Sequence, residues 1–350
     1  MKRFLLLLVC AVFLLGGRQS TRAQGDETLR LVTYDSFAIS EEVQTQFEQE
    51  TGITLEIVRL ADAGAMLNQV ILSRNNPLGD VLYGVDNTFL TRALNEDLFV
   101  PYQSPNLDTV PEMFQLDAEE YRVTPVAYGD VCLNYDAAYF EDMPLPESLL
   151  DLTDPAYESL LVVQNPAASS PGLAFLLATI AVFGEDGDYT YLDYWADLVA
   201  NDVLVVDGWT EAYYGEFSAG SENGERPLVV SYASSPPVEV LFAEEELEAA
   251  PTGAIVADET CFRQVEFAGI LEGTEKVEAA QQWIDFMLSE TFQEDLPLQM
   301  FVFPVNEDAA LPELFTEYAA IPENPVTMNI ELIEENRETW IEAWTQTVLR

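Results

Sequence analysis

A group of aromatic side chains at a turn is the first feature of this sequence that could do chemistry. Residues 207–217 read D-G-W-T-E-A-Y-Y-G-E-F, so Trp209 follows a glycine at the end of a predicted strand, and Tyr213 and Tyr214 begin a helix-like run. Rings that water can reach can stack on a flat ligand or a cation, and each such contact contributes about 0.5–2 kcal/mol. Packing in the core is the alternative for rings at helical spacing; it fits Tyr214 best and Trp209 least.

Composition excludes several kinds of catalysis. The 350-residue chain has no histidine, which removes Ser-His-Asp and Cys-His catalysis and histidine-based zinc sites. Pairs of carboxylates are available, but with 62 acidic residues such pairs are expected by chance. Composition therefore leaves three classes open: a ligand-binding protein with no catalytic residues, no cofactor and no metal, an exported carboxylate-dependent hydrolase, and a structural surface protein.

The elements that would position a ligand follow a β-loop-α-β-α-β order in the first hundred residues. Strands are predicted at 29–34, 53–60 and 80–85, one helix from Ser40 to Gly52, and a second through 66–71. This order is typical of a doubly wound sheet, in which ligands sit at the carboxyl ends of strands. The residues at these ends are Tyr34, Asp35, Ser36, Asp86 and Asn87. For the two aspartates, capping of the following helix is an equal alternative.

The middle and the end of the chain repeat this pattern. Strands are predicted at 160–166, 203–207 and 227–232, and helices at 168–184, from 233, at 275–289 and at the C-terminus. Serine and proline open the helix at 168–184, where free N–H groups are suited to an anion. In the terminal helix Trp340, Trp344 and Val348 are four residues apart, which we interpret as a core-facing stripe.

The N-terminus has the pattern of a secretory signal peptide, predicted to be residues 1–23. Two basic residues precede an apolar run, and a small-x-small cleavage site ends at Ala23. Cys10 lies inside the apolar run, so a lipid anchor there is a weak alternative. Removal of residues 1–23, which hold four basic residues and no acid, would change the formal charge from −48 to −52. We expect an exported protein, in the periplasm or at the outer face of the cell membrane, whose charge keeps it soluble and repels nucleic acid.

Two cysteines, Cys132 and Cys261, lie beyond the predicted signal peptide. Both are in strand-like runs, V-C-L-N-Y and C-F-R-Q-V-E-F. An isolated pair in an exported protein favours one disulfide, which would join the two strands if they are neighbours. Two buried free thiols are the alternative.

Five short motifs together resemble a known family. In chain order they are Y-D-S-F after the first strand, G-V-D-N after the third, S-S-P-G at a helix start, D-G-W-T-E-A-Y, and S-Y-A-S-S-P. With W-I-D-F-M-L-S and the terminal I-E-A-W, they extend over nearly the whole chain, from Leu29 to Arg350. The sequence resembles the thiamine-binding proteins of bacterial ABC importers.

The resemblance implies an α/β fold of the type II periplasmic binding proteins, in which two lobes, each with a doubly wound sheet, are joined by crossing hinge strands. We place the crossings near 127–133 and 260–267, which hold the two cysteines. Because crossing strands in such a hinge run side by side, the resemblance supports the disulfide. The expected lobes are residues 28–128 with 264–350, and residues 129–263.

The resemblance also implies a function and a set of contacts. The protein is expected to bind thiamine or a thiamine phosphate in the cleft, as a monomer, and to deliver it to an ABC permease. A receptor of the same fold for ferric iron, a polyamine or a phosphonate is the alternative. The implied ligand contacts are Tyr34, Asp35, Ser36, Asp86, Asn87, Ser169, Ser170, Gly172, Trp209, Tyr213, Tyr232, Ser234, Ser235 and Phe301.

Three positions depart from the family pattern. Ala167 stands where the family has an arginine just before S-S-P-G, which leaves free thiamine and its phosphates equally open. Val238 replaces a tyrosine after S-S-P, and Phe301 stands where the family has a tryptophan. The family's tryptophan after Y-D-S-F has no counterpart here. The aromatic cage is therefore expected to be thinner than in the family.

Overall fold

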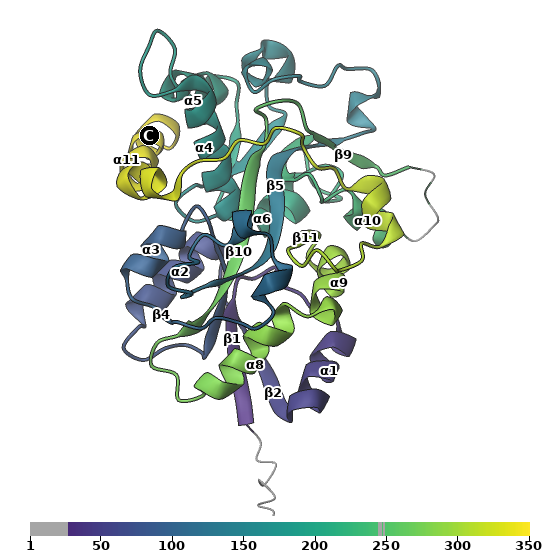
Figure 1. The fold of residues 1–350 in the computed structure, drawn as a ribbon. Helices are drawn as coiled ribbons and strands as arrows, with labels where there is room; N and C mark the ends of the chain where they lie inside the picture. The colour runs from purple at the N-terminus through teal and green to yellow at the C-terminus, as the bar shows by residue number, and fades with distance from the viewer. Residues whose placement is uncertain (1–26, 244–246, 248) are drawn as a thin grey trace, which may run out of the picture.

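The computed structural model describes residues 27–243, 247 and 249–350 (Figure 1). The predicted signal peptide therefore lies outside the described residues. The strands are β1 (Glu27–Thr33), β2 (Ile53–Arg59), β3 (Val81–Asp86), β4 (Phe99–Val100), β5 (Thr124–Asp136), β6 (Leu161–Gln164), β7 (Leu204–Val206), β8 (Leu228–Tyr232), β9 (Thr252–Ile255), β10 (Phe262–Leu271) and β11 (Phe303–Pro304). The α-helices are α1 (Glu41–Thr51), α2 (Ala63–Leu72), α3 (Leu90–Asn95), α4 (Ser170–Phe183), α5 (Tyr191–Ala200), α6 (Trp209–Glu211), α7 (Pro237–Leu241), α8 (Val277–Met287), α9 (Glu290–Gln299), α10 (Glu313–Tyr318) and α11 (Ile330–Val348).

Two parallel groups of strands are linked by two long antiparallel strands. Hydrogen bonding gives the order β2-β1-β3-β10-β5-β8-β6-β7, with parallel pairs at both ends and antiparallel pairs in the middle. Figure 1 shows β5 and β10 running through the centre of the molecule from one group to the other. The parallel pairs require helical crossovers, which is why helices alternate with strands along the chain. The predicted two-lobed α/β fold is confirmed, with its two sheets continuous through the hinge strands.

A disulfide joins the two hinge segments. Cys132 lies within β5, and Cys261 immediately precedes β10, whose Phe262 is paired with Val131. The structure links the two sulfur atoms at 2.08 Å, with both side chains fully buried. The alternative of two free thiols is therefore wrong for this structure. The bond closes a loop that spans 129 positions of the chain and includes most of the second group of strands.

Helix α1 follows the sequence signals for its two ends. The Ser40 hydroxyl accepts a hydrogen bond from the Val43 amide at 3.2 Å, and Gly52 ends the helix with φ 72°. A left-handed φ suits glycine because it has no side chain to clash with the backbone. Val43 and Phe47, four residues apart, are buried against the core. Both predicted helix ends are correct.

Replacement of Ser40 by alanine is expected to lower the free energy of unfolding by about 1 kcal/mol, because the Val43 N–H loses its acceptor. The Ser40 backbone N–H, which donates to Asp295, is unchanged by this substitution. Urea unfolding measures the loss. Ser40→Thr keeps the acceptor and should stay close to the wild type, and an alanine variant as stable as the threonine variant would contradict the assignment of the cap.

The terminal helix α11 carries the predicted apolar stripe. Trp340 and Trp344 are buried, and the ring of Trp344 packs edge-on against Trp195 of α5 at 5.5 Å. The indole N–H of Trp340 donates to Glu185 at 2.8 Å. The interpretation of this stripe as core is confirmed. The helix therefore packs on α5, which the predicted boundaries assign to the other lobe, and those boundaries stay a prediction.

No helix in the described ranges combines the length and the hydropathy that crossing a bilayer requires.

Candidate functional site

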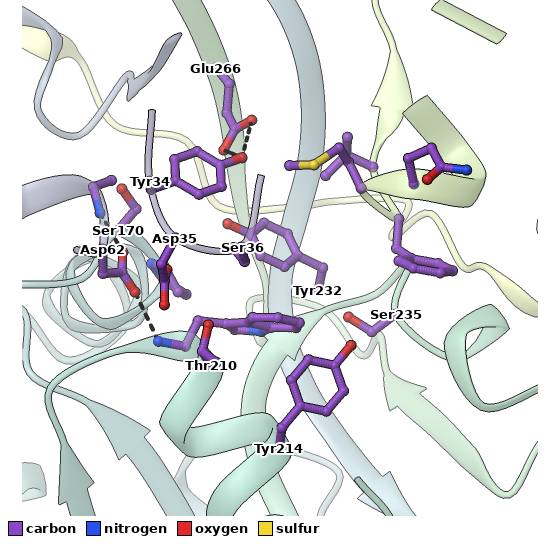
Figure 2. Close-up of a pocket in the computed structure, with 17 residues that line it drawn as sticks. Tyr34, Asp35, Ser36, Asp62, Ser170, Thr210, Tyr214, Tyr232, Ser235 and Glu266 are labelled. Atoms are coloured by element: carbon purple, nitrogen blue, oxygen red, sulfur yellow. Dashed lines mark hydrogen bonds between the residues drawn. The ribbon is translucent and has the colours of Figure 1, made fainter. Parts of the chain in front are cut away.

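A cavity of about 230 Å³ lies where strand ends from the two groups meet (Figure 2). One side is formed by the residues after β1 and by the start of α2, together with a side chain from the middle of β10. The other side is formed by the starts of α4 and α6, the end of β8 and the segment 299–302. The carboxyl ends of β1 and β8 both reach this cavity, as the general rule for ligands of open α/β sheets predicts.

Trp209 is the central aromatic residue of the wall. Its ring stacks on Tyr213 at 5.0 Å, with an angle of 23° between the planes, and its indole N–H donates to the Ser231 hydroxyl at 2.9 Å. The Tyr214 ring meets Trp209 edge-on at 5.5 Å. The indole is thus fixed by Tyr213, Tyr214 and Ser231, and it lines the cavity.

The two tyrosines after Trp209 have exchanged the positions expected for them. Tyr213 is fully buried behind the tryptophan and donates its hydroxyl to Glu239 at 2.7 Å, whereas Tyr214 is 46% exposed and lines the cavity. The reason is a π-helical turn at Ala212–Glu216, closed by a hydrogen bond from the Phe217 amide to the Ala212 carbonyl. A π-turn has more residues than an α-turn, so it changes which side chain faces the cavity. Tyr213 was expected to contact the ligand, but it does not line the cavity, and Tyr214 does.

Glu266 places a buried carboxylate on the wall of the cavity. The Tyr83 hydroxyl donates to one of its oxygens at 2.6 Å, and the Tyr34 hydroxyl lies 3.1 Å from both. Burial raises the pKa of Glu266 to about 7, although the tyrosine hydrogen bonds lower it in part, and the nearby Asp86 raises it further. This carboxyl group therefore changes charge near neutral pH.

Asp62 is a second carboxylate on the wall and connects the two sides of the cavity. It caps α2 by accepting from the Ala63 amide at 2.6 Å, and its other oxygen accepts from the Trp209 backbone amide at 2.8 Å. Burial raises its pKa to about 6, while these two amide hydrogen bonds oppose the shift. Since the start of α2 and Trp209 lie on different sides of the cavity, this contact links the two sides directly beside the aromatic wall.

Most of the residues predicted for the site lie on the cavity wall. Those that line it are Tyr34, Asp35, Ser36, Ser170, Trp209, Tyr232, Ser235 and Phe301. They are the residues that follow β1 and β8, open α4 and α6, and precede β11. Their location makes ligand contact possible, and their role stays a proposal.

The other predicted residues support the wall from behind. Asp86 is fully buried and accepts hydrogen bonds from the Ser170 hydroxyl and the Thr88 amide, the latter at 2.7 Å. The Asn87 side chain pairs with the backbone of β10 at Val265. Ser169, Gly172, Tyr213 and Ser234 are likewise packed inside and do not line the cavity.

Each of these buried positions has a local reason. A Cβ on Gly172 would lie 2.5 Å from the Gln164 carbonyl oxygen, so glycine lets α4 pack closely on β6. The Ser234 hydroxyl donates to the Phe301 carbonyl at 2.6 Å and so fixes the segment that forms the cavity's far end. Ser169 occupies the N-cap position of α4. Their predicted role as direct contacts is therefore corrected to a supporting one.

Several wall residues were not predicted from the sequence. They are Asp62, Ala63, Pro171, Thr210, Tyr214, Glu266, Gln299, Met300 and Val302. Asp62 follows β2 within three residues, so the strand-end rule that identified Asp35 could have found it. Glu266 lies inside a long strand and looks like any alternating polar residue, so no local signal marks it.

Residues 76–321 match the family described as "Bacterial extracellular solute-binding protein". The chain belongs to this family. Among its relatives, this solute-binding protein is 30% identical to the thiamine-binding periplasmic protein of Salmonella typhimurium, over 100% of both chains. It is also 30% identical to the thiamine-binding periplasmic protein of Escherichia coli, over 92% of this chain and 94% of the other.

Solved structures give the same picture of the fold. A periplasmic thiamin binding protein with 29% identity superposes with a TM-score of 0.81 over 93% of this chain and 97% of the other. Iron-bound HitA from Pseudomonas aeruginosa, with 20% identity and a TM-score of 0.74 over 92% of this chain and 99% of the other, shares the fold alone. The solute-binding protein is therefore a receptor and not an enzyme, as predicted. The family and the periplasmic relatives also confirm the predicted location outside the cytoplasm.

Proposed function

We propose that this solute-binding protein binds thiamine in the cavity between its lobes and delivers it to an ABC permease. The observation that carries the proposal is a wall that combines aromatic rings with carboxylates. Among the described residues that line the cavity there are Trp209, Tyr214 and Tyr232, the acids Asp35, Asp62 and Glu266, and no lysine or arginine. Thiamine is a flat aminopyrimidine joined to a cationic thiazolium, which matches both properties. The names of the relatives support the same ligand.

The rings and the acids have separate tasks in this proposal. The free face of Trp209 stacks on one ring of the ligand, and the stacked pair of Trp209 and Tyr213 keeps that face in position. Glu266 and Asp62 supply negative charge in a partly dehydrated cavity, where attraction to a cation is stronger than in water. The hydroxyl of Tyr232, held by the Gln264 amide at 2.9 Å, provides a further hydrogen-bond partner.

Capture follows from rotation of the two lobes about the hinge strands. We take residues 28–128 with 264–350 as one lobe and 129–263 as the other, and β5 and β10 as the hinge, joined by the disulfide. The hydrogen bond between Asp62 and Trp209 forms only when the lobes approach, so it contributes to the closed state that encloses the ligand. The closed monomer then docks on the permease.

The rival solutes fit this cavity less well. A phosphonate needs cationic partners, which the wall lacks among the described residues. A ferric site based on adjacent tyrosines is not formed, because Tyr213 is turned into the core and only Tyr214 lines the cavity. Within the described part of the chain, no group of three or more histidine, cysteine or acidic side chains is placed to hold a metal ion. A polyamine shares the cationic charge but not the flat rings.

Isothermal titration calorimetry on the purified protein tests the proposal. Thiamine should bind with a dissociation constant of about 1 μM or tighter, which corresponds to about −8 kcal/mol. Spermidine and ferric citrate serve as controls for simple cation binding and for iron. An absence of heat with thiamine, thiamine monophosphate and thiamine diphosphate would remove the proposed ligand, and tighter binding of spermidine would replace it.

A further inference from the structure

One end of the cavity is acidic. Asp35 and Asp62 lie there together, next to Ser170 at the start of α4, and the charge of Asp35 contributes to the raised pKa of Asp62 (Figure 2). Glu266 lies on the same wall. Three carboxyl groups thus face a space of about 230 Å³.

At the start of α4, where an anion could bind, the Ser170 hydroxyl already has a carboxylate as its partner. The Ser170 hydroxyl donates to Asp86, which is fully buried directly behind it. The Asp86 carboxyl group thus lies close to the positive end of the α4 dipole, where it competes with any incoming anion. A phosphate group approaching Ser170 and Pro171 would meet Asp86 behind them and Asp62 beside them.

Within the described ranges, no basic side chain on the cavity wall offsets this charge. None of the basic residues in the described part of the chain lines the cavity. Most are committed to ion pairs elsewhere, namely Arg30, Arg74, Arg122, Arg226, Arg263, Lys276 and Arg337. Arg59, close in sequence to Asp62, donates instead to the Phe37 carbonyl at 3.1 Å.

We propose that this acidic end makes the receptor selective for the unphosphorylated form of its cationic ligand, because Asp35, Asp62 and Glu266 face the cavity and Asp86 lies behind Ser170 and already accepts its hydroxyl. The inference rests on the proposed function and goes beyond it, since thiamine binding alone leaves the phosphates equally acceptable. Each phosphate adds negative charge that the closed cavity cannot neutralise, so affinity decreases from thiamine to the monophosphate and again to the diphosphate.

Calorimetry with the three compounds at pH 8 tests this selectivity. Thiamine should bind at least tenfold more tightly than the diphosphate, with the monophosphate between them. In Asp62→Asn the ratio of the thiamine and diphosphate affinities should fall several-fold, since one carboxylate is neutralised. The single amide oxygen can accept from only one of the Ala63 and Trp209 amides, so circular dichroism verifies the fold of this variant. Asp35→Asn, at an exposed position, is the second variant and should shift the ratio in the same direction even if Asp62→Asn folds poorly.

Glu342→Gln is the matched control, because it removes one exposed acid of α11 far from the cavity and should leave the ratio unchanged. Diphosphate affinity equal to or greater than that of thiamine in the wild type would overturn the inference while leaving the proposed function in place. A ratio that changes in neither Asp62→Asn nor Asp35→Asn would also overturn it. Failure of all three compounds to bind would instead contradict the proposed function.

Discussion

Trp209→Ala is expected to weaken thiamine binding at least 100-fold, or about 3 kcal/mol. The substitution removes the ring whose free face is offered to the ligand, and it leaves Tyr213 without the partner that covers it at 5.0 Å. It also removes the hydrogen bond that the indole N–H donates to the Ser231 hydroxyl in the wild type. Calorimetry, with circular dichroism to verify folding, measures the loss.

Two further variants separate stacking from general damage. Trp209→Phe keeps a flat ring over Tyr213 but loses the indole N–H and part of the ring area, so it should retain binding within about tenfold of the wild type. Tyr139→Ala removes an exposed ring outside the cavity and should have no effect on affinity. If Trp209→Ala binds thiamine as tightly as Tyr139→Ala does, the ligand does not use the indole face.

The parts of this site that the sequence predicted are those fixed by strand ends. Tyr34, Asp35 and Ser36 come directly after β1, and Tyr232 ends β8, so a rule about where strands stop was sufficient to place them. Trp209 was identified for the same reason. The hinge strands could be located because the family resemblance implies crossing strands, and the two cysteines lie in strand-like runs at those segments.

The exchange of Tyr213 and Tyr214 shows where such reasoning fails. Both residues follow Trp209, and an α-helical period gives each a definite direction. The π-helical turn at Ala212–Glu216 inserts one residue into that turn, and its cause lies in tertiary packing, because Tyr213 reaches Glu239 and Phe217 is fully buried. A local pattern of residues does not contain this information.

Glu266 was missed for a different reason. It lies in the middle of β10, opposite Asp86 of β3, and its oxygens are bound by tyrosines that are far away in the sequence. Only the pairing of β10 with β3 and β5 reveals that this side chain points into the cavity and not to solvent. The buried carboxyl group of Glu266 on the cavity wall could therefore be found only from the fold.

Thiamine affinity is expected to rise with pH between about 6 and 8, because the ionised form of Glu266 attracts the cation. In the ligand-free protein burial raises the pKa of this group to about 7, so much of it is protonated at pH 6 and most is ionised at pH 8. An ionised carboxylate about 5 Å from the cation contributes on the order of 3 kcal/mol at an effective dielectric constant of about 20. Calorimetry over this range, at constant ionic strength, measures the change.

The raised pKa of Glu266 affects the stability of the ligand-free protein in the opposite direction. The folded protein holds the Glu266 proton more tightly than the unfolded chain, so the ligand-free protein should lose stability as pH rises from about 4.5 through about 7, and thiamine should raise the melting temperature most at pH 8. Glu266→Gln can still accept from Tyr83 and has no charge to lose. The affinity of this variant for thiamine should be lower than that of the wild type at pH 8. It should keep only the weaker pH dependence near pH 6 that titration of Asp62 supplies. An unchanged pH profile in Glu266→Gln would mean that another group controls capture of the cation.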